Sequence, residues 1–215
     1  MDHRVGQVLD TLDRLGIRDD TIVIFASDNG PEEVAAYHGT SGYWRGHYFT
    51  ALEGSLRTPF LIRWPGKIPA GTVSNEIVHI TDLLPTIASI TGFKVPNDRL
   101  IDGIDQSDFL LGKKDKSDRE FIVTYVGDRV FSVKWRTMKV HFFTAEGTFS
   151  PIVEHTFPQV FDIKNDPGET RELWQAEGYA HLWVMKPVMD ILTGITISQR
   201  QYPNIKPGQD FSGYK

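Results

Sequence analysis

The apolar residues at the start of the chain follow the spacing of a helix. They recur at intervals of three and four positions: Val5, Val8, Leu9, Leu12 and Leu15. This pattern predicts an amphipathic helix over about residues 2–15, ended by Gly16. No capping residue precedes the helix, which indicates a further segment upstream. The apolar run at 21–26 predicts a strand, and a helix followed by such a run is typical of a sheet covered on both faces.

The next predicted elements are separated by a long loop. A polar stretch rich in glycine and aromatic residues runs from residue 27 to about residue 57, and "PFLIRWP" at 59–65 predicts a second strand. A helix is expected at about 82–91, with Asp82 as its cap and Gly92 at its end. Its apolar stripe consists of Leu83, Leu84, Ile87 and Ile90.

The character of the sequence changes after a charged run at 113–120, which we interpret as a solvated linker. Three short runs follow, "EFIVTYVG", "RVFSVKWR" and "TMKVHFF", and their partial alternation predicts an antiparallel meander. "VFDIKNDPGETREL" adds a fourth short strand, and a last helix is expected near 179–193, with Pro187 inside it. We therefore divide the chain into an α/β portion, residues 1–116, and a small α+β portion, residues 117–215.

Composition narrows the classes of function. The 215 residues include 40% hydrophobic and 24% charged residues, which is typical of a globular protein. A net charge of −5 without a Lys/Arg run argues against nucleic-acid binding. The absence of cysteine excludes disulfides and thiolate chemistry and leaves the compartment open. We expect no membrane span, and the N-terminus lacks the apolar core of a signal peptide.

Polar residues end the first predicted strand abruptly. The sequence "IVIFASDNGP" places Asp28 and Asn29 at the carboxyl end of the strand, where ligands bind in open α/β sheets. A carboxylate and a carboxamide offer the hard oxygen atoms that Ca²⁺ or Mg²⁺ prefers. The alternative is a simple turn, since Asp, Asn, Gly and Pro all favour turns.

Four motifs in order make the chain resemble the sulfatase family of the alkaline-phosphatase-like superfamily. They are strand-Ser-Asp-Asn-Gly-Pro, Glu-Gly-x-x-Arg-x-Pro from Glu53, "RWPG" and "DLLPT". The resemblance covers most of residues 2–116, and the meander with "VFDIKNDPGETREL" is similar to the small C-terminal subdomain of the family. It implies the later part of the sulfatase α/β domain, followed by an α+β subdomain.

The resemblance implies a divalent cation bound by Asp28 and Asn29, with Ca²⁺ the usual ion of the family and Mg²⁺ the alternative. In the family this cation also holds a formylglycine nucleophile, made from Cys or Ser in a Cys/Ser-x-Pro-x-Arg motif. Neither form of that motif occurs in this chain. Two further metal-binding aspartates of the family have no counterpart either. The family places these groups upstream, so the implied partner is a missing N-terminal half of the catalytic domain.

A second departure concerns the cation that contacts sulfate. The family commonly has Lys five residues before the Glu of Glu-Gly-x-x-Arg, and Tyr48 occupies that position here. We consider His38, Arg45 and Tyr48 as substrate-binding candidates and His47 as a catalytic candidate, because imidazole can contact sulfate or protonate a leaving alcohol. The alternative for both histidines is a surface or loop-packing role.

Other conspicuous residues receive structural interpretations. Glu53 and Arg57 are expected to form a buried ion pair that fixes the loop, and His79 is expected to pack. The aromatic residues of the loop either line a substrate pocket or anchor the loop: Tyr43, Trp44, Tyr48 and Phe49. Asp102, Asp105 and Asp108 lack the glycine and closing glutamate of a calcium-binding loop, so we expect a solvated, helix-capping segment.

Three functions remain open at this level. The first is hydrolysis of a small-molecule sulfate ester by the parent protein, to which this chain supplies part of the metal site but no nucleophile. The second is hydrolysis of a phosphonate monoester or phosphodiester by the same superfamily. The third is a non-catalytic remnant, which would aggregate or be molten because half a sheet exposes apolar faces and unpaired edges.

Overall fold

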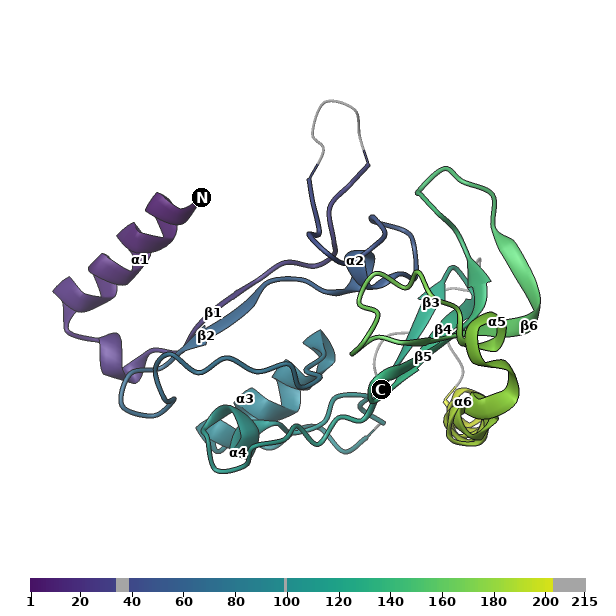
Figure 1. The fold of residues 1–215 in the computed structure, drawn as a ribbon. Helices are drawn as coiled ribbons and strands as arrows, with labels where there is room; N and C mark the ends of the chain where they lie inside the picture. Colours follow the sequence, from purple (N-terminus) through teal and green to yellow (C-terminus); the bar gives the residue numbers. More distant parts are fainter. Residues whose placement is uncertain (34–38, 99, 203–215) are drawn as a thin grey trace, which may run out of the picture.

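The computed structural model describes residues 1–33, 39–98 and 100–202. Figure 1 shows an elongated arrangement with α1 (Asp2–Leu15) at one end and a four-stranded sheet at the other. The predicted first helix has the expected bounds and ends at Gly16, whose φ of 69° is the left-handed conformation that glycine adopts readily. None of the residues of α1 is buried.

The first two strands form a narrow ribbon. After the 3₁₀ turn η1 (Arg18–Asp20), β1 (Val23–Ala26) pairs antiparallel with β2 (Phe60–Arg63). Within the described part of the chain neither strand has a second neighbour, and the residues of β1 are half-buried or exposed. The described residues therefore contain two strands of the expected sheet, and β1 is not fully buried in them.

The segment between the ribbon and the large sheet is held by one buried carboxylate. It contains η2 (Ile80–Asp82), α3 (Leu83–Thr91) and α4 (Ser107–Leu110), whereas α2 (Glu53–Leu56) lies earlier, between β1 and β2. The sequence predicted Asp82 as the cap of α3, but its side chain makes no capping hydrogen bond to that helix. Its carboxylate accepts hydrogen bonds from the backbone N–H groups of His79 and Ile104, 2.9 and 2.8 Å away, and from Arg119.

Two structural interpretations of this region change. The run 113–120 is not simply a solvated linker, because the Arg119 guanidinium is buried and its Nε lies 2.8 Å from Asp82 Oδ2. A buried guanidinium or carboxylate is strongly destabilising without a partner of opposite charge. This ion pair therefore fixes the connection between the two portions of the chain. His79 has the expected structural role, but as a cap: its ring nitrogen accepts from the Thr81 N–H at 3.3 Å.

The predicted meander is confirmed. β3 (Phe121–Val126), β4 (Arg129–Trp135), β5 (Met138–Thr144) and β6 (Val153–Asp162) form an antiparallel sheet in sequence order. The fourth strand is longer than expected and begins at Val153. One face packs on α5 (Leu173–Glu177), η3 (Gly178–Val184) and α6 (Met185–Gln201). The core there consists of Val133, Met138, Val140, Val160, Leu173, Val184 and Val188.

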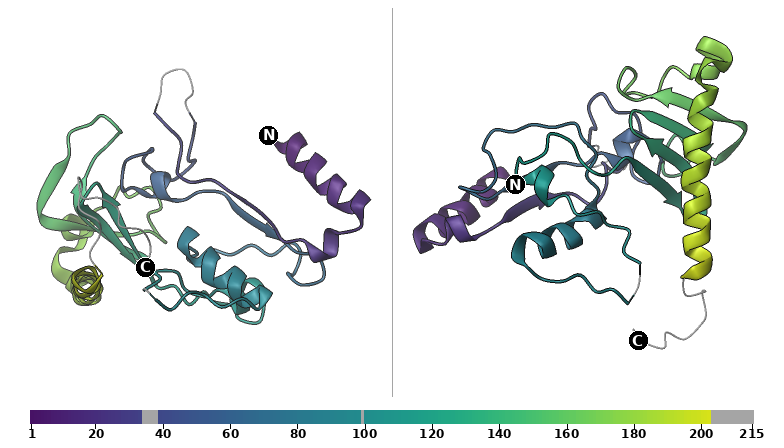
Figure 2. Two further views of the ribbon diagram at one scale, coloured as in Figure 1. Left: turned by 180° about the vertical axis from the view of Figure 1, so that it is seen from behind. Right: turned by 90° about the horizontal axis from the view of Figure 1, so that it is seen from below.

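The last helix differs from the prediction at both ends. Residues 178–184 form a 3₁₀ segment, and α6 then runs from Met185 to Gln201. Pro187 is the third residue of α6, where the missing N–H has no helical partner to lose. Figure 2 shows α6 as a long rod across the end of the molecule. No helix in the described ranges is long and apolar enough to cross a membrane.

Candidate functional site

The Asp28–Asn29 turn lies directly on α2. The Gly30 N–H donates to the Ser55 carbonyl at 2.8 Å. A side chain at Gly30 is excluded, because a Cβ atom there would lie 1.9 Å from the Gly54 carbonyl oxygen. Backbone approach this close requires glycine, so the sequence Asp-Asn-Gly fixes the turn against one helix.

The loop that follows is stacked on the same helix. The Gly54 N–H donates to the Arg45 carbonyl at 2.7 Å, and Gly46, with a φ of 101°, lies against the buried Leu52. The Tyr48 N–H donates to the Pro31 carbonyl at 2.9 Å. Arg45, His47 and Tyr48 are therefore carried by one segment that is bonded to the metal-binding turn predicted from the sequence.

The metal candidates differ in exposure. Asp28 is exposed, and its Oδ1 accepts from the Asn29 N–H at 3.0 Å. Asn29 is half-buried and donates from Nδ2 to the Gly30 carbonyl at 2.7 Å, which leaves its Oδ1 as the free acceptor of that side chain. The two residues fit a hard cation as a pair of oxygen donors, which is fewer than the six to eight that Ca²⁺ takes. Among the described residues no group of three or more His, Cys, Asp or Glu side chains gathers as a metal site.

Two of the substrate-binding and catalytic candidates have buried nitrogen atoms without a hydrogen-bond partner. Arg45 Nε and His47 Nδ1 are both buried and without a hydrogen-bond partner. Buried polar atoms are nearly always paired, so each of these two atoms has room for a water or an anionic partner, as do other such atoms in the described residues, among them Ser132 Oγ and His141 Nδ1. Tyr48 is half-buried, with its ring edge-on to the ring of Phe49 at 4.6 Å. His38 lies outside the described residues.

The predicted Glu53–Arg57 ion pair is confirmed, with Arg57 Nε 2.7 Å from Glu53 Oε2. The Glu53 side chain is 1% exposed and has two more cationic partners, Lys134 Nζ at 2.7 Å and Lys139 Nζ at 3.0 Å. Burial alone would raise the pKa of the Glu53 carboxyl, but the lysines and Arg57 outweigh it and hold that pKa far below its usual range. Glu53 is therefore ionised at neutral pH.

A second buried carboxylate extends this network. Glu169 accepts from the Glu53 N–H at 2.6 Å, and its Oε1 lies 3.1 Å from Lys139 Nζ and 2.6 Å from His141 Nε2. Burial lowers the pKa of His141, and Lys139 lowers it further, against the opposing effect of Glu169. His141 is therefore neutral, and it donates its Nε2–H to Glu169.

The ionic network fills the seam between the two portions of the chain. In the register of the sheet Lys134 faces Lys139 and Ser132 faces His141, so these four side chains share one face. That face looks like a solvent face by sequence, but α2 and Glu169 cover it. The sequence identified the Glu53–Arg57 pair and missed the other members, because only the tertiary fold brings them within reach. The available signal was one lysine in each of the strands "RVFSVKW" and "MKVHFFT", Lys134 and Lys139.

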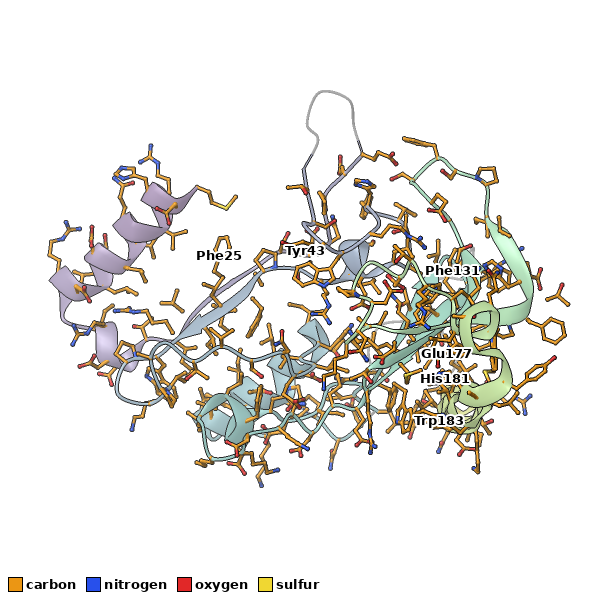
Figure 3. All side chains as sticks on the ribbon, viewed as in Figure 1. Phe25, Tyr43, Phe131, Glu177, His181 and Trp183 are labelled. Carbon is orange, nitrogen blue, oxygen red and sulfur yellow. The ribbon has the colours of Figure 1, made fainter. Side chains whose placement is uncertain are left out.

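The loop aromatics divide between anchoring and exposure. The Arg57 guanidinium stacks over the Trp44 ring, 5.1 Å from its centroid, so Trp44 anchors the loop to the ionic network. Tyr43 and Phe49 are 91% and 51% exposed. Figure 3 shows Tyr43 close to α2, between the ribbon and the large sheet that contains Phe131.

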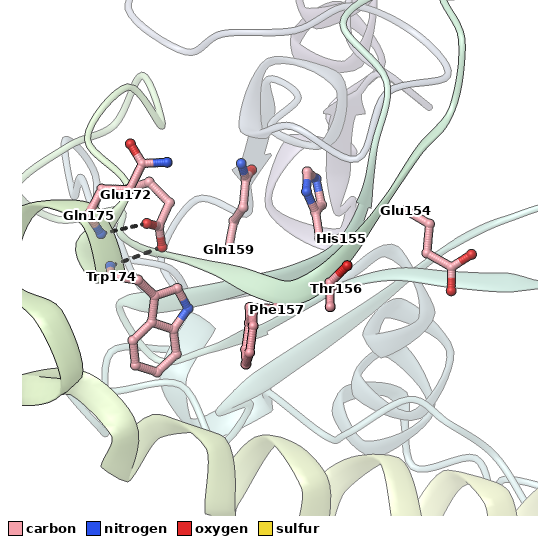
Figure 4. A pocket seen from close by; sticks show the side chains of 8 residues that line it. All are labelled: Glu154, His155, Thr156, Phe157, Gln159, Glu172, Trp174 and Gln175. Atoms are coloured by element: carbon pink, nitrogen blue, oxygen red, sulfur yellow. Dashed lines mark hydrogen bonds between the residues drawn. The ribbon is translucent and has the colours of Figure 1, made fainter.

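Other groups lie outside this region. A cavity of about 350 Å³ is lined by residues of β6 and α5 (Figure 4), and shares no residue with the candidate site. Its Glu172 carboxylate accepts from the Trp174 and Gln175 N–H groups and so caps α5. The three loop aspartates form no metal group: Asp105 Oδ1 accepts from the Ser107 N–H at 2.8 Å, at the start of α4, and Asp108 pairs with Lys113.

Comparison with known proteins assigns the family. A sequence model described as "Sulfatase" matches residues 1–93, and one described as "C-terminal region of aryl-sulfatase" matches residues 117–206. The chain belongs to the sulfatase family. It is 34% identical to human steryl-sulfatase over 88% of this chain and 38% of that protein. It is 37% identical to bovine arylsulfatase A over 80% of this chain and 37% of that protein.

Solved sulfatase structures share the fold. The PsFucS1 sulfatase from Pseudoalteromonas sp. superposes with a TM-score of 0.83 and 28% identity, over 94% of this chain and 42% of that one. A Bacteroides thetaiotaomicron protein described with the metabolism of glycosaminoglycans gives 0.74 and 25%, over 91% and 43%. This sulfatase chain thus has the alkaline-phosphatase-like fold of its relatives and spans well under half of their length.

Proposed function

We propose that this chain is the later part of a metal-dependent sulfatase that hydrolyses a small-molecule sulfate ester. Asp28 and Asn29 supply two oxygen ligands of a divalent cation, with Ca²⁺ the preferred ion and Mg²⁺ the alternative. The observation that carries the proposal is the turn itself: glycine contacts pin Asp28-Asn29-Gly30 on α2, in a chain whose sulfatase match runs through these residues.

The cation would supply charge neutralisation on the ester oxygens and activation of the attacking hydroxyl. The nucleophile is provided by a preceding segment in this proposal, because the chain has no cysteine and no Ser-x-Pro-x-Arg motif. In this proposal the residues of this chain position the ester and neutralise its negative charge. Arg45 and His47, each with one buried unpaired nitrogen, are placed to donate to an anionic group held beside the turn.

The C-terminal portion has a positioning role in this proposal. Glu53 and Glu169 carry two negative charges against the three positive charges of Arg57, Lys134 and Lys139, with His141 neutral. The surplus positive charge lies beneath the loop that carries the candidate substrate contacts. A buried positive charge there favours an anionic substrate, whether sulfate or phosphate.

The test uses the complete protein, including the preceding segment. Wild-type protein is expected to hydrolyse 4-methylumbelliferyl sulfate and to lose activity on chelation, with recovery on Ca²⁺ addition. Asp28→Asn should lower both the activity and the calorimetric affinity for Ca²⁺ by at least tenfold, whereas Asp102→Asn, the same change at an exposed aspartate of the 100–106 loop, should alter neither.

A matched phosphate ester decides between the two hydrolytic chemistries. Tyr48 at the position of the usual sulfate-binding lysine is the observation that favours testing a phosphonate or phosphodiester substrate. Faster turnover of the phosphate diester than of the sulfate ester would refute the proposed sulfatase reaction in favour of phosphodiester hydrolysis. Ca²⁺ affinity that is equal in wild type and Asp28→Asn would remove the metal assignment.

A further inference from the structure

The loop of the candidate site contains a strained residue that packing does not explain. Phe49 has a φ of 71°, in the left-handed region that side chains with a Cβ atom avoid. It is the third residue of a turn closed by the Thr50 N–H on the His47 carbonyl at 3.0 Å. Turns with a positive φ at this position favour Gly or Asn. A phenylalanine there is unfavourable for the backbone.

The surroundings of the turn enforce this conformation. The Tyr48 N–H is bonded to the Pro31 carbonyl at 2.9 Å, and the Tyr48 carbonyl accepts from Thr148 Oγ1 at 2.8 Å. The Thr50 hydroxyl also donates to the His47 carbonyl at 2.8 Å, and Thr50 is 2% exposed. Strain persists where neighbours over-determine the backbone, and such sites cluster where ligands bind.

Burial does not compensate for the strain. Among the described residues, the Phe49 side chain is 51% exposed, and its aromatic contact is a nearly perpendicular packing with the Tyr48 ring, with 4.6 Å between the ring centroids. A glycine would satisfy the turn, the clamp and the packing of Thr50 equally well. The ring is the only thing that phenylalanine adds, and it is added on the segment that is bonded to Pro31, two residues beyond Asn29.

We propose that the Phe49 ring is a specificity-determining contact that stacks on the ring of the organic part of the ester substrate. The inference rests on the proposed function, because the ester must be held at the Asp28–Asn29 turn for its organic part to reach Phe49. An aromatic face binds flat groups rich in C–H, which includes both aryl rings and the apolar face of a pyranose. Thr148, from the β5–β6 connection, is a positioning residue that holds the Tyr48 carbonyl.

The kinetic test compares ring-bearing with acyclic esters in the complete protein. Phe49→Ala and Phe49→Gly should raise KM for 4-methylumbelliferyl sulfate or for a pyranose 6-sulfate by about three- to tenfold, the size of one aromatic contact, with kcat retained. KM for ethyl sulfate should stay unchanged. Phe157→Ala, which removes a 77% exposed ring from β6, is the matched control and should change neither. Equal losses on cyclic and acyclic esters, or none on either, would overturn the proposal.

A stability measurement tests the premise separately. Both variants lack the ring, and only Gly relieves the positive φ, so Phe49→Gly should unfold about 2–4 °C above Phe49→Ala. A lower midpoint for the glycine variant would refute the strain. If the wild-type protein turns over no ester, the proposed function fails, and saturation-transfer NMR with 4-methylumbelliferyl sulfate decides the inference. Signal that Phe49→Ala abolishes supports ring binding, and absent or equal signal in both proteins refutes it.

Discussion

Replacing Glu53 by glutamine removes the charge at the centre of the seam between the two portions of the chain. Glutamine keeps the shape of the side chain and some hydrogen bonding, so the change isolates the charge. Three cations then lose their shared counter-ion. Lys139 is 0% exposed and Lys134 is 11% exposed, so water cannot replace the carboxylate, while Glu169 remains beside Lys139 only.

The magnitude follows from burial. Removing one partner of a buried ion pair costs about 3–5 kcal/mol in the free energy of unfolding, since the remaining charge is left uncompensated. Glu169 retains part of the compensation, so we expect a loss of about 3 kcal/mol for Glu53→Gln. For a chain of this size that lowers the melting temperature by about 6–12 °C.

Urea unfolding followed by tryptophan fluorescence measures the loss, because Trp135 and Trp174 pack against the core of the C-terminal portion. Glu120→Gln is the matched control. Its ion pair with Arg136 has the same chemistry and a separation of 2.7 Å, but both side chains are more than half exposed, so the expected loss is below about 1 kcal/mol. The double variant Glu53→Gln/Lys134→Met should be more stable than Glu53→Gln alone, because Glu53 is the carboxylate that Lys134 pairs with, while Lys139 keeps Glu169. A loss under 1 kcal/mol for Glu53→Gln, or strict additivity in the double variant, would refute the reasoning.

Three further predictions address the titrating histidine, the glycine contact and the second buried pair. The pKa of His141 is lowered in the folded protein, so its contribution to stability is complete above about pH 6.5 and is lost as pH falls toward the folded value. Urea titrations should therefore show stability falling by up to about 1.4 kcal/mol per pH unit below pH 6.5, with a shallower slope in His141→Gln; identical slopes would contradict this. Gly30→Ala should lower the free energy of unfolding by about 1–3 kcal/mol and weaken Ca²⁺ binding, because the added Cβ atom has no room beside Gly54. Gly6→Ala, in open space on α1, is the control and should not destabilise the protein. Equal unfolding midpoints for the two variants would count against the close contact. Arg119→Met should cost about 3–5 kcal/mol by urea unfolding, because Asp82 stays buried without its counter-ion, and a loss as small as that of Arg136→Met would show that the pair is not desolvated.

Local patterns were sufficient for most of the elements. The helical spacing before Gly16, the helix before Gly92 and the alternating runs after residue 120 each produced the expected structure. Errors arose where an outcome depended on distant groups. The 113–120 run was interpreted as solvated because most of its residues are charged. Arg119 is nevertheless buried, in an ion pair with Asp82, which lies 37 residues earlier in the chain. Asp82 looked like a cap because it begins a helix, yet the same arginine and two backbone donors take its oxygen atoms.

The sequence by itself determined the family, and it predicts Asp28 and Asn29 as two oxygen donors, because motif order and strand-end position are properties of the chain. Only the tertiary structure decided that the polar face of the meander is an interior seam. Lys139 and His141 alternate with apolar residues just as solvent-facing side chains do, and periodicity carries no information on what covers a face. Glu53 and Glu169 come to that face from 86 and 28 residues away. Their charges, and not the local pattern, make burial of the cations possible.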